Sequence, residues 1–307
     1  SDNSKAEIER LKDEIAQSPS VTGQSHLVRS YHKEINMLGA ANWFYIGFYA
    51  LLNNDWDSAL SSFSKCIELD PKNIVSYLNR GAAQMGNGNY PLAIQSFEKV
   101  VRLDSYNAYA YKNLGTIYMG QGKNAKAIHA FSKAIEIAPG DVIVYINLGQ
   151  IYKRQKKYLK AIQEYQKAIS ITPDNIVVFR ELGYAHKKQE QFPQAIQAYE
   201  KVIEYDPGDA DNYINMGYAY DELGNYPKAI KAYENSIELD QTNPVVYYNL
   251  GYVYFEQSNY LQAEQSYKKA IVLDPENADA YINLGNVYKR MDNYLKAIKT
   301  YEKAIEI

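Results

Sequence analysis

The residue types that most often perform catalysis are scarce in this sequence, and their spacing fits no familiar mechanism. Four histidines occur, none with a partner at metal-ligand spacing: His26, His32, His129 and His186. A single cysteine, Cys66, excludes an internal disulfide and a cysteine-based zinc site. In GQGK at 120–123 the residue five before Gly122 is Ile117, where a phosphate-binding loop needs glycine, so we expect a turn between helices. The sequence therefore predicts no enzyme, no metal site and no cofactor.

Uncharged hydrogen-bonding side chains are abundant instead. Tyrosine occurs 31 times, about one residue in ten. Asparagine recurs at a fixed interval, with Glu181 at the one missing step: Asn79, Asn113, Asn147, Asn215, Asn249 and Asn283. An asparagine amide both donates and accepts, so such a row could pair with the N–H and C=O groups of an extended peptide. Each bond would contribute about 1 kcal/mol.

The interval reflects an internal repeat of 34 residues. Glycine recurs with this period at 47, 81, 115, 149, 183, 217, 251 and 285, and alanine at 59, 93, 127, 161, 195, 229, 263 and 297. Proline follows the same period at 71, 139, 173, 207 and 275. Units therefore start at 40, 74, 108, 142, 176, 210, 244 and 278. Within a unit, apolar residues three, four and seven apart predict two antiparallel helices.

This pattern resembles the tetratricopeptide repeat. That family has an aromatic residue at repeat position 4, Leu at 7, Gly at 8, Tyr at 11, Ala at 20, an aromatic at 24, Ala at 27 and Pro at 32. Repeats 3, 4 and 7 match every position; departures in repeats 1, 2 and 5 include Ala50, Cys66, Arg80, Gln84, Val100 and His186. The resemblance covers residues 40–307 and implies an all-α, right-handed superhelical solenoid of helix-turn-helix repeats. It is specific for fold and weak for function.

In this family the first helix of each repeat turns positions 2, 5, 6 and 9 toward a concave groove where ligands bind; we call these the groove positions. The asparagine row falls at position 6 and resembles the ladder in the repeat domain of O-GlcNAc transferases. Asparagine is also the family's common residue there, so a direct ligand role stays one of two interpretations. Position 9 in three successive repeats is Tyr184, Tyr218 and Tyr252, which we expect to form a second row.

Charged residues are unevenly distributed over the first helices. Repeats 3 to 5 have an excess of bases: Lys112, Lys153, Arg154, Arg180, Lys187 and Lys188. Repeats 6 and 7 have acids instead: Asp211, Asp221, Glu222 and Glu256. A partner with an acidic segment would be attracted to the basic repeats. The alternative is ordinary solvation of helix ends. With 33 basic and 36 acidic residues, the chain is too neutral to predict nucleic-acid binding.

The most apolar run is WFYIGFYALL at 43–52. It is shorter than the roughly 20 residues that span a bilayer, so no membrane span is predicted. Trp43, Ile46 and Gly47 fall on core positions of repeat 1. The remaining side chains form an expected apolar patch: Phe44, Tyr45, Phe48, Leu51 and Leu52. Either residues 1–39 cover this patch or it is an open docking surface.

Residues 1–39 lack the glycine, alanine and proline columns, and we expect them to form an N-terminal helical hairpin that caps the array at 40–307. The leading functional prediction is a protein-interaction scaffold that binds an extended peptide or partner segment. Two alternatives are a substrate-recruiting domain of a larger enzyme, such as a glycosyltransferase, and a homo-oligomeric structural scaffold. No N-x-[ST] sequon occurs, which favours a cytoplasmic location.

Overall fold

The computed structural model describes Arg10 and residues 25–307, and every regular element in that part is a helix. The first helices of the repeats are α2 (Ser25–Leu52), α4 (Ile74–Gly86), α6 (Ala108–Gly120), α8 (Val142–Arg154), α10 (Ile176–Lys188), α12 (Ala210–Glu222), α14 (Pro244–Glu256) and α16 (Ala278–Arg290). The second helices are α3 (Trp56–Leu69), α5 (Tyr90–Leu103), α7 (Asn124–Ile137), α9 (Tyr158–Ile171), α11 (Phe192–Tyr205), α13 (Tyr226–Leu239), α15 (Tyr260–Leu273) and α17 (Tyr294–Glu306).

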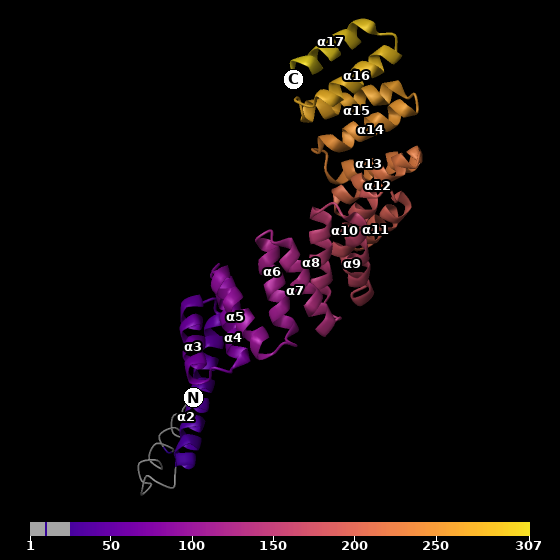
Figure 1. Cartoon of the computed structure of the whole chain (residues 1–307). Coiled ribbons are helices and arrows are strands. Elements are labelled where there is room, and N and C mark those ends of the chain that lie inside the picture. Colours follow the sequence, from indigo (N-terminus) through magenta and orange to yellow (C-terminus); the bar gives the residue numbers. More distant parts are fainter. Residues whose placement is uncertain (1–9, 11–24) are drawn as a thin grey trace. The chain divides into compact units, whose positions relative to one another are not determined.

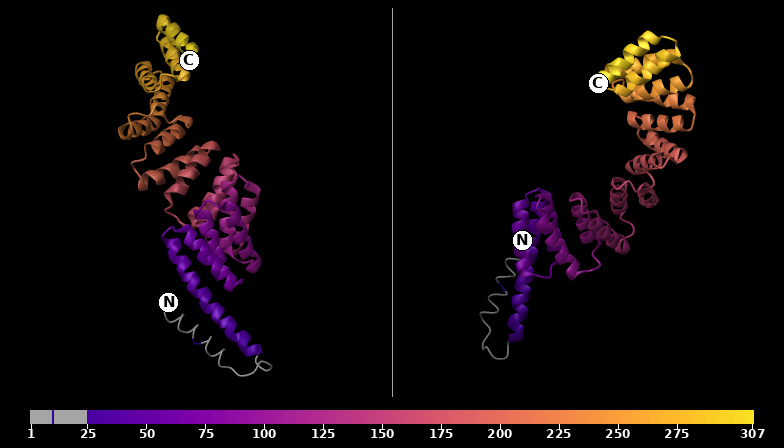
Figure 2. Two further views of the ribbon diagram at one scale, coloured as in Figure 1. Left: turned by 90° about the vertical axis from the view of Figure 1, so that its left-hand side faces the viewer. Right: turned by 45° about the horizontal axis from the view of Figure 1, so that its top comes forward.

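The chain divides into two compact units, one up to Val144 and the other from Tyr145. In the first unit α2 to α7 pack in chain order, each helix on the next (Figure 1). In the second unit α9 to α17 do the same, as the two further views also show (Figure 2). The predicted all-α repeat solenoid is therefore confirmed. Among the described residues, no helix has the length and apolarity that crossing a bilayer requires.

Asparagine caps explain where many of the first helices begin. The residue before the helix accepts, through its side-chain oxygen, a hydrogen bond from the backbone N–H three residues later. The distance from the backbone N to the asparagine Oδ1 is 2.9 Å for Ser76 and Asn73, 3.0 Å for Ala110 and Asn107, and 3.0 Å for Ala280 and Asn277. Each cap satisfies one N–H group that the first turn of a helix leaves without an intrahelical partner.

The glycine column lets the two helices of a repeat approach closely. In repeat 3, a Cβ atom on Gly115 would lie 2.5 Å from Cε1 of Phe131, which is fully buried on α7. No real Cβ contact is that short, so an aromatic ring at position 24 requires glycine at position 8. The alanine column has the same cause, since Ala93 and Ala127 are fully buried.

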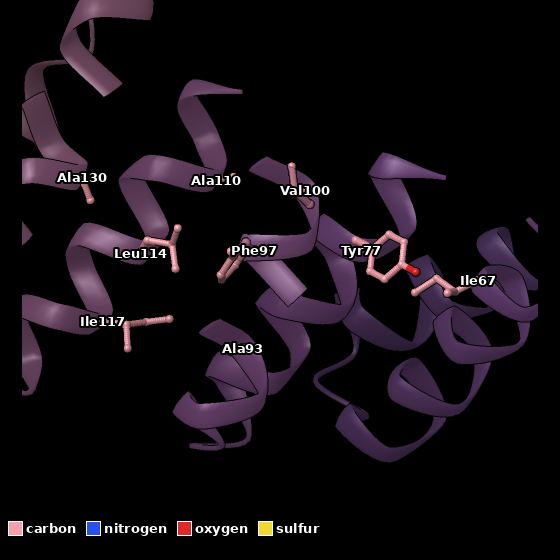
Figure 3. Packing of buried hydrophobic residues seen from close by; sticks show 9 residues of the cluster. All are labelled: Ile67, Tyr77, Ala93, Phe97, Val100, Ala110, Leu114, Ile117 and Ala130. Carbon is pink, nitrogen blue, oxygen red and sulfur yellow. The ribbon is translucent and has the colours of Figure 1, made fainter. Parts of the chain in front are cut away.

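Within each unit a repeat is covered by its neighbour, so the core continues from one repeat to the next. In the first unit Phe97 and Val100 from α5 form one buried cluster with Leu114 and Ile117 from α6 (Figure 3). Leu114 at position 7 is only 6 % exposed, because the second helix of the preceding repeat packs over it.

The turn between the two helices of each repeat contains one residue with a positive φ angle, in the left-handed region of backbone conformation. These residues are spaced 34 apart along the chain. Three of these residues are glycines, at 88, 122 and 224, and the other five are Asn54, Lys156, Glu190, Ser258 and Asp292. The predicted turn at 120–123 is confirmed, with Gly122 at φ +70°.

The N-terminal boundary differs from the simplest expectation. The second helix of the expected hairpin and the first helix of repeat 1 are one continuous helix, α2, of 28 residues. The expected division between residues 39 and 40 therefore coincides with no break. Gly39 alone does not interrupt the helix, because one interior glycine costs only about 1 kcal/mol. Before Ser25 only Arg10 of the expected hairpin is among the described residues, so the cap stays a prediction.

Candidate functional site

The six asparagines at position 6 are all half-buried, in the same place on successive first helices. In three of them Nδ2 donates to the carbonyl oxygen four residues earlier: Asn79 to Val75 at 2.9 Å, Asn113 to Tyr109 at 2.8 Å and Asn215 to Asp211 at 2.9 Å. An asparagine amide has two N–H groups, so one donor stays available in each. These bonds hold the amides in a fixed orientation within each unit.

The three tyrosines at position 9 remain at the surface, with Tyr184 37 %, Tyr218 36 % and Tyr252 43 % exposed. Aromatic and cationic neighbours orient the first two. The ring of Tyr184 stands edge-on to Tyr158, and the ammonium of Lys187 lies 5.3 Å from the ring centroid of Tyr218. These rings offer accessible apolar surface with a hydrogen-bonding end.

Three of the predicted basic residues are already paired inside the protein. Nζ of Lys112 lies 2.7 Å from Oδ2 of Asp141, and Nη2 of Arg180 lies 2.6 Å from Oδ2 of Asp209. Lys153 contacts both carboxylate oxygens of Glu181, at 2.8 and 2.6 Å. The two aspartates are the last residues of their repeats, at position 34. The sequence-based expectation of an excess of positive charge did not take them into account. The sequence pattern that predicts these two ion pairs is a base at position 5 and an acid at position 34 of the same repeat.

Two of the three remaining predicted bases, Lys187 and Lys188, lie beside the ring of Tyr184. Lys187 donates to Oδ1 of Asn215 at 2.5 Å, and Lys188 lies 5.7 Å from the ring centroid of Tyr184. Burial, with a smaller contribution from Lys188, lowers the pKa of Lys187. Arg154 is exposed at the end of α8.

The predicted acids of repeats 6 and 7 have no ion-pair partner in the part of the chain that the structure describes. Asp221 and Glu222 are the last two residues of α12, and Glu256 is the last residue of α14. Burial, then the charges of Glu222 and Glu256, raise the pKa of Asp221 to about 6. A hydrogen bond to Glu222, followed by burial, raises the pKa of Tyr218 to about 12.

Family models match most of this helical array. One model, described as TPR repeat, matches residues 220–258 and 251–292. Three models described as tetratricopeptide repeat match 106–174 and 141–207, 278–307, and 62–95 and 198–231. Together these matches cover residues 62–95 and 106–307. The chain is built of tetratricopeptide repeats. No curated protein matches the sequence.

Solved structures agree with this family. A structure of MamA is 26 % identical, has a TM-score of 0.52, and matches 54 % of this chain and 90 % of its own. The C-terminal part of a TPR repeat-containing protein from Cytophaga hutchinsonii is 22 % identical, with a TM-score of 0.67, covering 78 % of this chain and 99 % of its own. A tetratricopeptide repeat protein from Parabacteroides merdae is 17 % identical, with a TM-score of 0.53, covering 81 % and 98 %. The last two support the fold alone.

In the first tetratricopeptide repeat, three apolar residues differ in exposure from what the sequence predicts. Phe44 and Leu51 pack against the buried cluster around Phe63 instead of lying on an open surface. Ile46, expected in the core, is 43 % exposed. The described residues include no second helix of a preceding repeat that could cover position 7 here. Three patch residues do lie at the surface: Tyr45 at 71 %, Phe48 at 41 % and Leu52 at 67 % exposed.

His186 and Cys66, whose side chains could in principle react, are both buried and hydrogen-bonded within the repeats. His186 is 9 % exposed and a ring nitrogen lies 2.7 Å from Oε1 of Gln191, as expected for a core histidine of a tetratricopeptide repeat. Cys66 is buried, accepts a hydrogen bond from Ser76 Oγ at 2.8 Å, and burial raises the pKa of its thiol. No group of metal-binding side chains exists among the described residues. Tetratricopeptide arrays are as a class interaction modules rather than catalysts.

Proposed function

We propose that the groove positions of these tetratricopeptide repeats bind an extended peptide or partner segment. The observation that supports this most directly is the row of half-buried asparagines, several held in one orientation by their own helices. Asn147 and Asn249 have no side-chain hydrogen bond within the described residues, so their donors and acceptors are available to a main chain. The exposed position-9 tyrosines border the same row and supply apolar contact.

The ion pairs alter what the partner should look like. An acidic segment would compete with Asp141, Glu181 and Asp209 for the bases that already bind them. Of the predicted bases, only Lys187, Lys188 and Arg154 are in no ion pair within the described residues, and the first two lie beside Tyr184. We therefore propose that the main chain of the partner provides most of the affinity and that its charge is secondary.

The test is the triple replacement of Asn147, Asn215 and Asn249 by alanine, which all lie in the second unit. Wild type and variant are exposed to an array of peptides of randomised sequence, and the strongest binders are measured by calorimetry. Three lost hydrogen bonds should weaken binding roughly tenfold to hundredfold. Circular dichroism should show an unchanged helical content.

The matched control removes three exposed amides from the second helices: Gln163, Gln197 and Gln265 replaced by alanine. It should leave the affinity unchanged. Equal affinity of wild type and the asparagine variant would contradict the proposal. The alternatives of an enzyme-recruiting domain and a homo-oligomeric scaffold stay predictions, since no contact in the described residues favours either.

A further inference from the structure

A cavity of about 390 Å³ opens beside α10 and α12 in the second unit. Five of its lining residues occupy groove positions: Arg180, Glu181, Tyr184, Asp211 and Asn215. It therefore belongs to the surface on which we place the bound segment. Its volume lies within the range of small-ligand sites, which is roughly 300–1,000 Å³.

Two buried side chains that line this cavity have polar atoms without a hydrogen-bond partner among the described residues. Asn212 on α12 is 1 % exposed, and neither Oδ1 nor Nδ2 is paired. Tyr199 on α11 is also 1 % exposed, and its hydroxyl is unpaired. Buried polar groups are paired in the great majority of cases, so one donor, one acceptor and a hydroxyl left open at one place indicate a missing polar group.

Asparagine is exceptional at this point of the repeat. Position 3 of the other repeats from the second onward is small or apolar: Ser76, Ala110, Val144, Val178, Val246 and Ala280. Val178 and Val246 are fully buried, as is expected for a position that faces the preceding second helix. Packing alone would favour valine over Asn212, because burying an unpaired amide lowers stability. A residue that lowers stability is more readily explained by binding.

Four of the five charged residues that line the cavity form two ion pairs, which restricts the chemistry of its ligand; the fifth, Asp211, is exposed and has no ion-pair partner among the described residues. Lys153 is paired with Glu181, and Arg180 with Asp209. A carboxylate on the ligand would have to displace one of these acids. An ammonium group would lie beside two cations and could pair only with the exposed Asp211, because the other two acids are already engaged. The ligand group that fits best is therefore uncharged, with both a donor and an acceptor.

We propose that this cavity receives a carboxamide side chain, glutamine or asparagine, of the bound segment. Its C=O accepts from Nδ2 of Asn212 while its N–H donates to Oδ1, and the hydroxyl of Tyr199 takes a further bond. The proposal rests on the proposed peptide-binding function and adds a specificity to it. Asn212 and Tyr199 are then the residues that distinguish a carboxamide from an apolar side chain of the same size.

The experiment uses the strongest peptides of the randomised array. Each is resynthesised in sets in which every position in turn holds glutamine, glutamate, lysine or leucine. With the wild-type protein, one position should prefer glutamine over leucine by about tenfold, because leucine leaves the buried amide unpaired. A preference for glutamate or lysine there, or no preference at any position, overturns the proposal.

Two variants test the assigned residues. Asn212→Val should remove the glutamine preference while raising the Tm by roughly 2–4 °C, since valine suits the position and no amide is buried. Tyr199→Phe keeps the ring, like Phe63, Phe97 and Phe131 at the same position, and should reduce the preference. Opposite changes of specificity and stability separate a binding role from a structural one.

Two control variants remove unpaired buried groups that do not line the cavity. Ser236→Ala should raise the Tm and Tyr233→Phe should not lower it, and both should keep the glutamine preference. A preference that survives Asn212→Val overturns the assignment. If no peptide binds the wild-type protein at all, the proposed function itself fails; if peptides bind without a glutamine preference, only this inference fails.

Discussion

Single residues decide how closely the helices of this protein can approach. Gly115 lies under the ring of Phe131, and an added Cβ would come within 2.5 Å of it. The neighbouring Gly120, in the last turn of the same helix, has no atom within 4 Å of the place where a Cβ would stand. One helix therefore contains a glycine required by packing and one that packing does not require.

Gly115→Ala should lower the free energy of unfolding by about 1–3 kcal/mol, because the fully buried ring of Phe131 would have to shift to make room for the Cβ atom. Gly120→Ala should leave it unchanged or raise it slightly through helix propensity. Urea denaturation of both variants measures the difference. A stable Gly115→Ala protein would show that the ring can shift and that the column is not a packing requirement.

At the scale of helices, α12 and α14 have acidic residues at their C-terminal ends, where a negative charge is unfavourable. The helix macrodipole favours cations at the C-terminus. Helices α8, α10 and α16 have them there, whereas α12 ends with Asp221 and Glu222 and α14 with Glu256. Of these three acids Asp221 is half-buried, whereas Glu222 and Glu256 are exposed.

Asp221→Asn should stabilise the protein at neutral pH. The pKa of Asp221 is about 6 in the folded protein, against 3.8 for an unperturbed aspartate, so the folded state binds the proton more tightly than the unfolded state. The penalty is absent below about pH 4, grows as the pH rises toward 6 and is complete above it. The gain in unfolding free energy, measured by urea denaturation, should be at most about 2 kcal/mol at pH 7.5, because solvent screens part of the effect at this half-exposed group, and it should be close to zero near pH 4.

Asp240→Asn is the control of opposite sign. Hydrogen bonds from Thr242 lower the pKa of Asp240, so its contribution is present above the unfolded value and is lost as the pH falls. That replacement should destabilise the protein at pH 7.5 and have less effect near pH 4. A gain for Asp221→Asn that does not depend on pH would mean that burial of charge is not its cause.

At the scale of the molecule, each unit is a row of neighbouring cores. In the second unit one buried cluster joins α12 to α14 and another joins α15 to α17, each made of residues close in sequence. A repeat array of this kind is stabilised by its repeats and by the interfaces between neighbours. Damage should therefore spread mainly to adjacent repeats.

Tyr267→Ala tests this within the second unit. The ring is 1 % exposed on α15, and its loss should cost about 3–5 kcal/mol. Hydrogen exchange followed by mass spectrometry should show the largest loss of protection in α14 to α17 and the smallest in α10 and α11. A uniform loss through the unit would indicate one cooperative core.

The repeat and its helices follow from the sequence because the pattern is local and is repeated. The 34-residue columns, the turn at Gly122 and the core histidine His186 are all recoverable from single-residue spacing. The departures from the consensus in repeat 2 were also visible, although only the structure joins them: Ser96 accepts from Nε of Arg80 at 3.2 Å and donates to Gln84 at 2.7 Å.

The sequence by itself determined the fold class, the length of the repeat and which residues occupy the groove positions. The tertiary structure decided which of those residues are free to bind. Lys112 and Arg180 are paired with acids 29 residues away, and Lys153 with one 28 residues away. The packing of α2 likewise exposes Ile46 and buries part of the apolar run. Periodicity assigns a side chain to a face of its helix, whereas its partners and its exposure depend on what the neighbouring repeat places against that face.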